Sequence, residues 1–169
     1  HVHIAVKYGT LFVGKLSRGK EKPLNSVALS YGIAQIAESG WTELTLRYAD
    51  KVTIGTAKAL LVDSRYSKLY VEKVGSFVTE SKYDHIEIAN LNNFVAEGGF
   101  TGFELGNITG KLDITTGYGS IKVENIASGF EDVNIESKYC KIKLQFEEQA
   151  SYLLNVETSY APIKFDEDN

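Results

Sequence analysis

The chain has 169 residues, the length of one ordinary domain, and its 43% hydrophobic and 24% charged residues exclude wholesale disorder. A net charge of −4 and a pI of about 5.4 argue against a nucleic-acid partner. The single cysteine excludes an intramolecular disulfide, and no apolar run is long enough to predict a membrane-spanning helix.

An aromatic residue recurs along the chain, followed by apolar residues three and five positions later, as in Tyr118-Gly-Ser-Ile-Lys-Val123. Successive aromatic residues are 17 or 18 positions apart through the middle of the chain. A fixed period of this length is typical of repeat architectures. The aromatic positions are Tyr8, Tyr31, Tyr48, Tyr66, Tyr83, Phe100, Tyr118, Tyr139 and Tyr160.

A second short strand is predicted before each aromatic residue, as in Leu112-Asp-Ile114. A small residue lies two positions before the aromatic residue, and another small residue follows it in most copies. Each repeat therefore consists of two period-two strands joined at a corner, too short to bury its own apolar face. We predict an all-β fold, a single-stranded parallel β-solenoid or right-handed β-helix of about nine short coils.

The stacking makes specific predictions about columns of side chains. Ile86, Phe103 and Ile121 should lie one above the next in the core. A turn ladder of stacked amides is predicted for Asn90, Asn107 and Asn125. The only segment with a helix-like pattern is 33–38.

We predict one β-solenoid domain over residues 1–169, with a basic insertion loop at 14–26 and an acidic C-terminal tail at 166–169. Pro162 suits an edge strand in the last coil. The chain contains no methionine, so we expect that a segment before His1 was removed. A cleaved secretory signal would fit, which favours an extracytoplasmic location, in the periplasm or at the cell surface.

The sequence predicts no catalytic residue, no cofactor and no metal site. Known nucleophile, phosphate-binding and zinc motifs do not occur, and His85 is interpreted as a surface residue. Cys140 takes the small slot after the aromatic residue, which predicts a buried, unreactive thiol.

A column of acidic residues three positions before the aromatic residue is interpreted as a solvated face, with basic neighbours that compensate its charge. The acidic residues are Asp63, Glu80, Glu97, Glu136 and Glu157, and the basic neighbours are Arg65, Lys82 and Lys138.

The aromatic column is the candidate binding stripe. One interpretation is that adjacent rings stack and brace the corner of the solenoid, and the other is that they bind a glycan or a protein partner. The stripe comprises Tyr48, Tyr66, Tyr83, Phe100, Tyr118, Tyr139 and Tyr160. The oligomeric state is left open.

The repeat in Leu112-Asp-Ile-Thr-Thr-Gly-Tyr-Gly-Ser-Ile-Lys-Val123 resembles the adhesin-like family of bacterial β-solenoid repeats, a domain of unknown function in exported or lipid-anchored surface proteins. The resemblance extends from about Ile4 to Phe165. It implies a non-enzymatic binding module at the cell surface. The alternatives are a carbohydrate-active enzyme, a lyase or glycosidase that uses clustered carboxylates, and a self-assembling structural scaffold.

Overall fold

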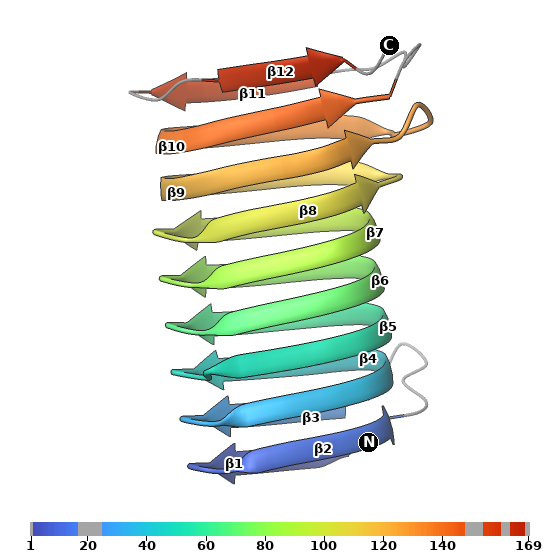
Figure 1. Ribbon diagram of the computed structural model, residues 1–169, viewed down its shortest axis with the longest axis vertical. Coiled ribbons are helices and arrows are strands. Elements are labelled where there is room, and N and C mark those ends of the chain that lie inside the picture. Colours follow the sequence, from blue (N-terminus) through green and yellow to red (C-terminus); the bar gives the residue numbers. More distant parts are fainter. Residues whose placement is uncertain (1, 17–24, 148–153, 160–162, 168–169) are drawn as a thin grey trace.

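The protein, seen in a computed structural model, is a stack of β-strands (Figure 1). The structure describes residues 2–16, 25–147, 154–159 and 163–167. In chain order the strands are β1 (His3–Lys7), β2 (Thr10–Leu16), β3 (Asn25–Ser30), β4 (Ile33–Arg47), β5 (Lys51–Arg65), β6 (Lys68–Lys82), β7 (His85–Gly99), β8 (Gly102–Ile108), β9 (Lys111–Ile126), β10 (Asp132–Phe146), β11 (Leu154–Ser159) and β12 (Ile163–Glu167).

Each long strand bends around the core and belongs to two faces of the stack. The first part of β4 pairs with β2 and its second part pairs with β3. In the same way β7 pairs first with β8 and then with β9. All of these pairings are parallel, so one turn of the chain lies directly on the turn before it.

The predicted parallel β-solenoid is confirmed. An aromatic residue lies at each repeated corner, either between two strands, as Tyr66 does between β5 and β6, or within a long strand, as Tyr118 does in β9. Eight such corners, from Tyr8 to Tyr139, have the same backbone conformation, and seven turns lie between them. The ninth predicted corner residue, Tyr160, and the edge-strand residue Pro162 lie outside the described residues.

The core is a set of hydrophobic columns held in register by the strand pairing. Ile86 pairs with Phe103, which pairs with Ile121. All three side chains are at most 1% exposed. The predicted column is therefore confirmed, and the interior consists of matching side chains supplied by successive turns.

The predicted amide ladder is also confirmed. The Asn107 side-chain amide donates to Asn90 Oδ1 at 3.0 Å, and the Asn125 amide donates to Asn107 Oδ1 at 3.2 Å. Asn107 thus uses its donor toward one turn and its acceptor toward the next, so the ladder fixes register at a surface turn.

Three local predictions need revision or restriction. The prediction of a helical turn at 33–38 is wrong, because these residues belong to β4. Ala34 and Ile36 point inward, and Ile33 and Gln35 point outward, which is the alternation of a strand. Residues 14–16 of the predicted insertion lie in β2 and 25–26 in β3, while 17–24 lie outside the described residues. Asp166 and Glu167 of the predicted tail belong to β12, and 168–169 lie outside the described part.

We expect Phe103→Ala to lower the free energy of unfolding by about 3–5 kcal/mol, because it removes a fully buried ring and leaves a cavity between two turns. Phe12→Ala is the matched control, since Phe12 is 73% exposed on β2 and its removal should have an effect within about 0.5 kcal/mol. Urea unfolding followed by circular dichroism measures both. Equal losses in the two variants would contradict the core assignment.

Candidate functional site

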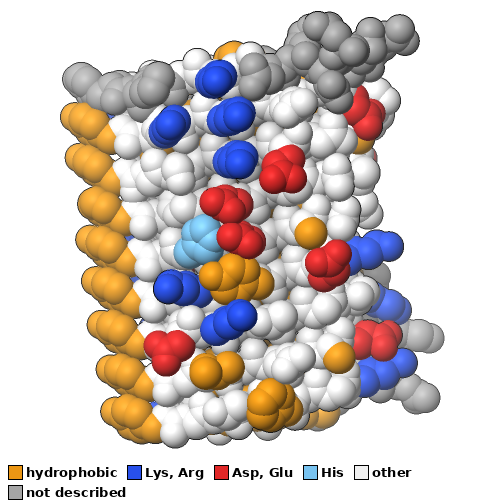
Figure 2. Space-filling view, viewed as in Figure 1, with side chains coloured by type: hydrophobic (Ala, Val, Ile, Leu, Met, Phe, Trp, Pro, Cys, Tyr) orange, Lys and Arg blue, Asp and Glu red, His pale blue; other side chains and the backbone are white. Residues whose placement is uncertain are grey.

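The corner residues form one continuous stack of rings, which we call the aromatic ladder. Its described members are Tyr8, Tyr31, Tyr48, Tyr66, Tyr83, Phe100, Tyr118 and Tyr139. Neighbouring ring centroids are 4.7–5.1 Å apart, and the ring planes differ by 1–13°. The rings are nevertheless 45–69% exposed and run along one edge of the molecule, as the orange column in Figure 2 shows. Stacking and exposure therefore occur together.

The backbone of every residue in the ladder is left-handed, with φ between 51° and 59°. This conformation costs an L-residue about 1–2 kcal/mol, and glycine is the residue that adopts it freely. The corner is held by backbone hydrogen bonds between turns: Tyr83 N–H donates to Gly99 O, and His85 N–H donates to Ser67 O, both at 3.0 Å. None of the described glycines has a positive φ, so the chain puts aromatic residues where a glycine would fit with less strain.

Ring stacking is the interaction that offsets this strain. An inner ring such as Tyr83 stacks on Tyr66 at 4.8 Å and on Phe100 at 4.7 Å. Each aromatic pair contributes about 0.5–1.5 kcal/mol beyond the burial of area. Because the faces of an inner ring are covered by its neighbours, the ring edges and hydroxyl-bearing ends form the surface that a partner meets.

We expect Tyr83→Ala to lower the free energy of unfolding by about 1–3 kcal/mol, because two stacking contacts are lost and the left-handed strain remains. Tyr83→Gly loses the same contacts but relieves the strain, so it should be about 1 kcal/mol more stable than the alanine variant. Urea unfolding of the two variants gives the difference. A glycine variant less stable than the alanine variant would contradict the strained-corner account.

A groove of about 1250 Å³ lies beside the ladder and includes Tyr118 in its lining. The column just before the aromatic residues is basic at Lys82 and Lys138 but has glycine at positions 99 and 117 between them. A Cβ at Gly99 or Gly117 would come no closer than 3.9 Å to any neighbouring atom. Neither packing nor backbone conformation therefore requires these glycines, and their effect is to leave the surface open between two lysines.

The predicted acidic column is present, and its members other than Asp63 line the same groove. Glu80 pairs in register with Glu97, and both line the groove, as does Glu136 two turns further along. Charge compensation is direct at Asp63, whose Oδ1 lies 3.1 Å from Arg47 Nη2 and 3.5 Å from Arg65 Nη1. The groove thus offers both signs of charge next to the rings.

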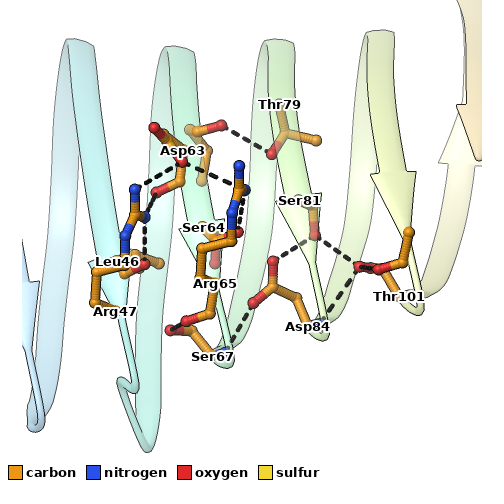
Figure 3. A network of polar contacts seen from close by, with 12 residues as sticks. Leu46, Arg47, Asp63, Ser64, Arg65, Ser67, Thr79, Ser81, Asp84 and Thr101 are labelled. Atoms are coloured by element: carbon orange, nitrogen blue, oxygen red, sulfur yellow. Dashed lines mark hydrogen bonds and ion pairs between the residues drawn. The ribbon is translucent and has the colours of Figure 1, made fainter.

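A buried polar network joins successive turns at Ser67, Asp84 and Thr101, the residues that follow the aromatic residue, together with Ser81 (Figure 3). Asp84 is 6% exposed and accepts a hydrogen bond from Ser67 N–H at 2.8 Å and another from the Ser81 hydroxyl. The Ser81 and Thr101 hydroxyl oxygens are 2.9 Å apart. Burial raises the pKa of Asp84 above its ordinary value, and the hydrogen bonds from Ser81 and Ser67 oppose that rise. Asp84 and Thr101 are the exceptions among the small residues that follow the aromatic residue. Their hydrogen bonds join the two successive turns to which they belong.

We expect the stability difference between wild type and Asp84→Asn to depend on pH. The folded-state pKa of Asp84 is raised, so its ionisation favours the unfolded chain, and wild-type stability is lost as pH rises through that pKa. Asparagine keeps an acceptor for Ser67 N–H without ionising, and its amide group can donate to the Ser81 hydroxyl oxygen in place of the bond that Ser81 donates to Asp84. The variant should be the more stable protein near pH 7, and its advantage should shrink toward about pH 4, where aspartate protonates. Urea unfolding at both pH values measures the difference, and a pH-independent difference would contradict this assignment.

Cys140 and His85 are the other two residues that the sequence singles out. Cys140 is fully buried, donates to Lys138 O at 3.3 Å, and has a pKa raised by burial, all of which fit an unreactive thiol. His85 is at the surface, but its Nε2 lies 2.8 Å from Glu87 Oε1, and Glu104 lies beside them. The hydrogen bond from His85 lowers the pKa of Glu87. The sequence analysis did not predict this cluster. The signal for it was that Glu87 and Glu104 lie four positions after two successive aromatic residues, Tyr83 and Phe100.

Comparisons with protein-family models, with curated proteins and with solved structures found no match in any of the three. Among the described residues, no helix has the length and hydropathy of a membrane span.

Proposed function

We propose that the protein is a non-enzymatic binding module of a bacterial cell surface, similar to adhesins, and that the aromatic ladder and its groove contact a glycan or a protein partner. The observation that carries the proposal is the repeated use of exposed aromatic residues at left-handed corners. The extracytoplasmic location rests on the resemblance of the repeat to surface proteins.

Two physical arguments support binding in addition to bracing. The turn alone could be made by glycine without strain, so the rings are not needed for the backbone conformation. Stacking also fixes each ring before any partner arrives, so a partner meets contact area that loses little side-chain entropy on binding. Tyrosine is the residue that most often supplies such rigid, amphipathic contact area.

The shape of the surface indicates an extended partner. The ring edges repeat every 4.7–5.1 Å along the solenoid, so a ligand that repeats along its length can make the same contact in several turns. The groove next to them carries lysine and glutamate side chains, which can hydrogen-bond hydroxyl or peptide groups. A polysaccharide or an extended peptide segment meets both requirements.

A glycan array and a surface-protein pull-down test the proposal. We expect wild type to bind at least one ligand, and the triple variant Tyr66→Ala, Tyr83→Ala, Tyr118→Ala to lose at least about tenfold in affinity for it. The triple variant Tyr66→Phe, Tyr83→Phe, Tyr118→Phe keeps the stack, as Phe100 does, and separates ring contacts from hydroxyl contacts. Lys143→Gln, on the neighbouring face and outside the lining of the groove, is the control. The same affinities in folded wild type and alanine variant would refute binding by the ladder.

A carbohydrate-active enzyme is the second candidate, favoured by the groove in which Glu80, Glu97 and Glu136 lie with Lys82 and Lys138. Glycoside hydrolysis and elimination both use carboxylates or basic residues placed around one bond. Any glycan that binds should therefore be incubated with the protein and the products analysed. Cleavage that is lost in Glu97→Gln would favour the enzyme, whereas an intact glycan would favour the binding module.

A further inference from the structure

Three metal-binding side chains meet on the face next to the one that carries the groove. His85 and Glu87 are two residues apart on β7, so both point outward, and Glu104 on β8 pairs in register with Glu87. One donor atom from each of the three lies within 4.8 Å of the others. In Figure 2 the histidine in pale blue lies directly against acidic side chains near the middle of the face. The register of the solenoid alone is enough to bring these groups together.

The charges of this cluster are incompletely balanced. Glu87 contacts His85, but the ion pairs formed among the described residues leave Glu104 without a basic partner. Lys122 pairs with Glu104 in register, on the side away from His85. Two carboxylates held next to each other by strand pairing repel unless a cation lies between them. The imidazole and the two carboxylates therefore surround a position that favours positive charge.

The surroundings leave open space at this position and hold the histidine ring. Glu87 and Glu104 line a hollow of about 340 Å³ that also includes Gly106. Gly106 has to be glycine, because a Cβ there would lie 2.2 Å from Ala89 O. The Tyr70 ring lies against His85 with the centroids 5.9 Å apart. Tyr70, which lines the same hollow, thus holds the histidine ring, and both carboxylates border the open space.

We propose that His85, Glu87 and Glu104 bind a zinc ion. Imidazole nitrogen with carboxylate oxygen is a donor set that Zn²⁺ accepts, whereas Ca²⁺ and Mg²⁺ prefer oxygen ligands alone. Zn–N and Zn–O bonds are about 2.0–2.2 Å long, so the half-exposed acidic side chains have to turn inward slightly to meet one ion. Three protein ligands leave a fourth position, toward the hollow, for water or for a donor atom of a bound molecule. The site lies apart from the aromatic ladder and does not depend on its function.

The ion would also strengthen the fold locally. Glu87 and Glu104 lie on successive turns, so a shared zinc ion cross-links β7 and β8. Two lysines lie next to the site: Lys122 pairs in register with Glu104, and Lys68 pairs with His85. Their positive charges repel a bound cation and so weaken its binding. Zinc affinity should therefore increase in Lys122→Gln.

The test uses a protein in which His1 and His3 are changed to Gln, so that the histidines near the N-terminus cannot bind the metal. Isothermal titration with zinc chloride should give one ion per chain for this protein. His85→Gln and Glu104→Gln in the same background should each weaken binding by at least about tenfold. Glu97→Gln, which removes a carboxylate of the groove, is the matched control and should bind as the background protein does. Calcium chloride should give no binding heat at the same concentrations.

Cobalt(II) provides a second measurement that needs no change at the site. Its visible absorption should show the intense bands of low-coordinate Co²⁺ on binding to the background protein and should fall when zinc is added. The proposal is overturned if the background protein takes up neither metal, if His85→Gln binds zinc as tightly as the background, or if calcium competes equally.

Discussion

Strict register between successive turns is the constraint on which the rest of the structure depends. Parallel pairing places Ile86, Phe103 and Ile121 in one column, the asparagine amides in a second and the aromatic rings in a third. A slip of one residue would turn the core side chains toward solvent and break every column together. The repeated side chains are therefore both the result of the register and the interactions that maintain it.

The same register explains how the surface of the solenoid holds chemical groups in fixed positions. The left-handed corners bring the rings to a spacing at which they stack, and stacking offsets a backbone strain that glycine would have avoided. On the neighbouring face the register sets His85 and Glu87 beside Glu104. Each feature is a column or a pair of columns, so substitutions in a single turn alter it locally while the neighbouring turns keep the fold.

The columns could be predicted from the sequence because the repeats are regular: Ile86, Asn90 and Tyr83 are each followed at the same distance by a residue of the same kind, Phe103, Asn107 and Phe100. The left-handed corner could not, because an aromatic residue in a strand pattern normally predicts extended backbone, and the usual signal of a positive φ, glycine, is absent. Asp84 and Thr101 were visible only as exceptions to the small-residue column, since their hydrogen bonds join different turns. The His85 cluster was missed because its ligands come from two successive turns, His85 and Glu87 from one and Glu104 from the next.

Electron–electron distances between spin labels test the stacking most directly. Labels at Phe12, Gln35, Lys122 and Lys143 lie in one outward column of paired residues, in a background where Cys140 is changed to Ser, the residue found in that slot at position 67. At about 4.8 Å per turn, the pairs 35/122, 35/143 and 12/143 should be about 24, 29 and 34 Å apart, a steady increase with the number of turns. Distances that do not increase in this way, or that are the same for all three pairs, would contradict the in-register solenoid.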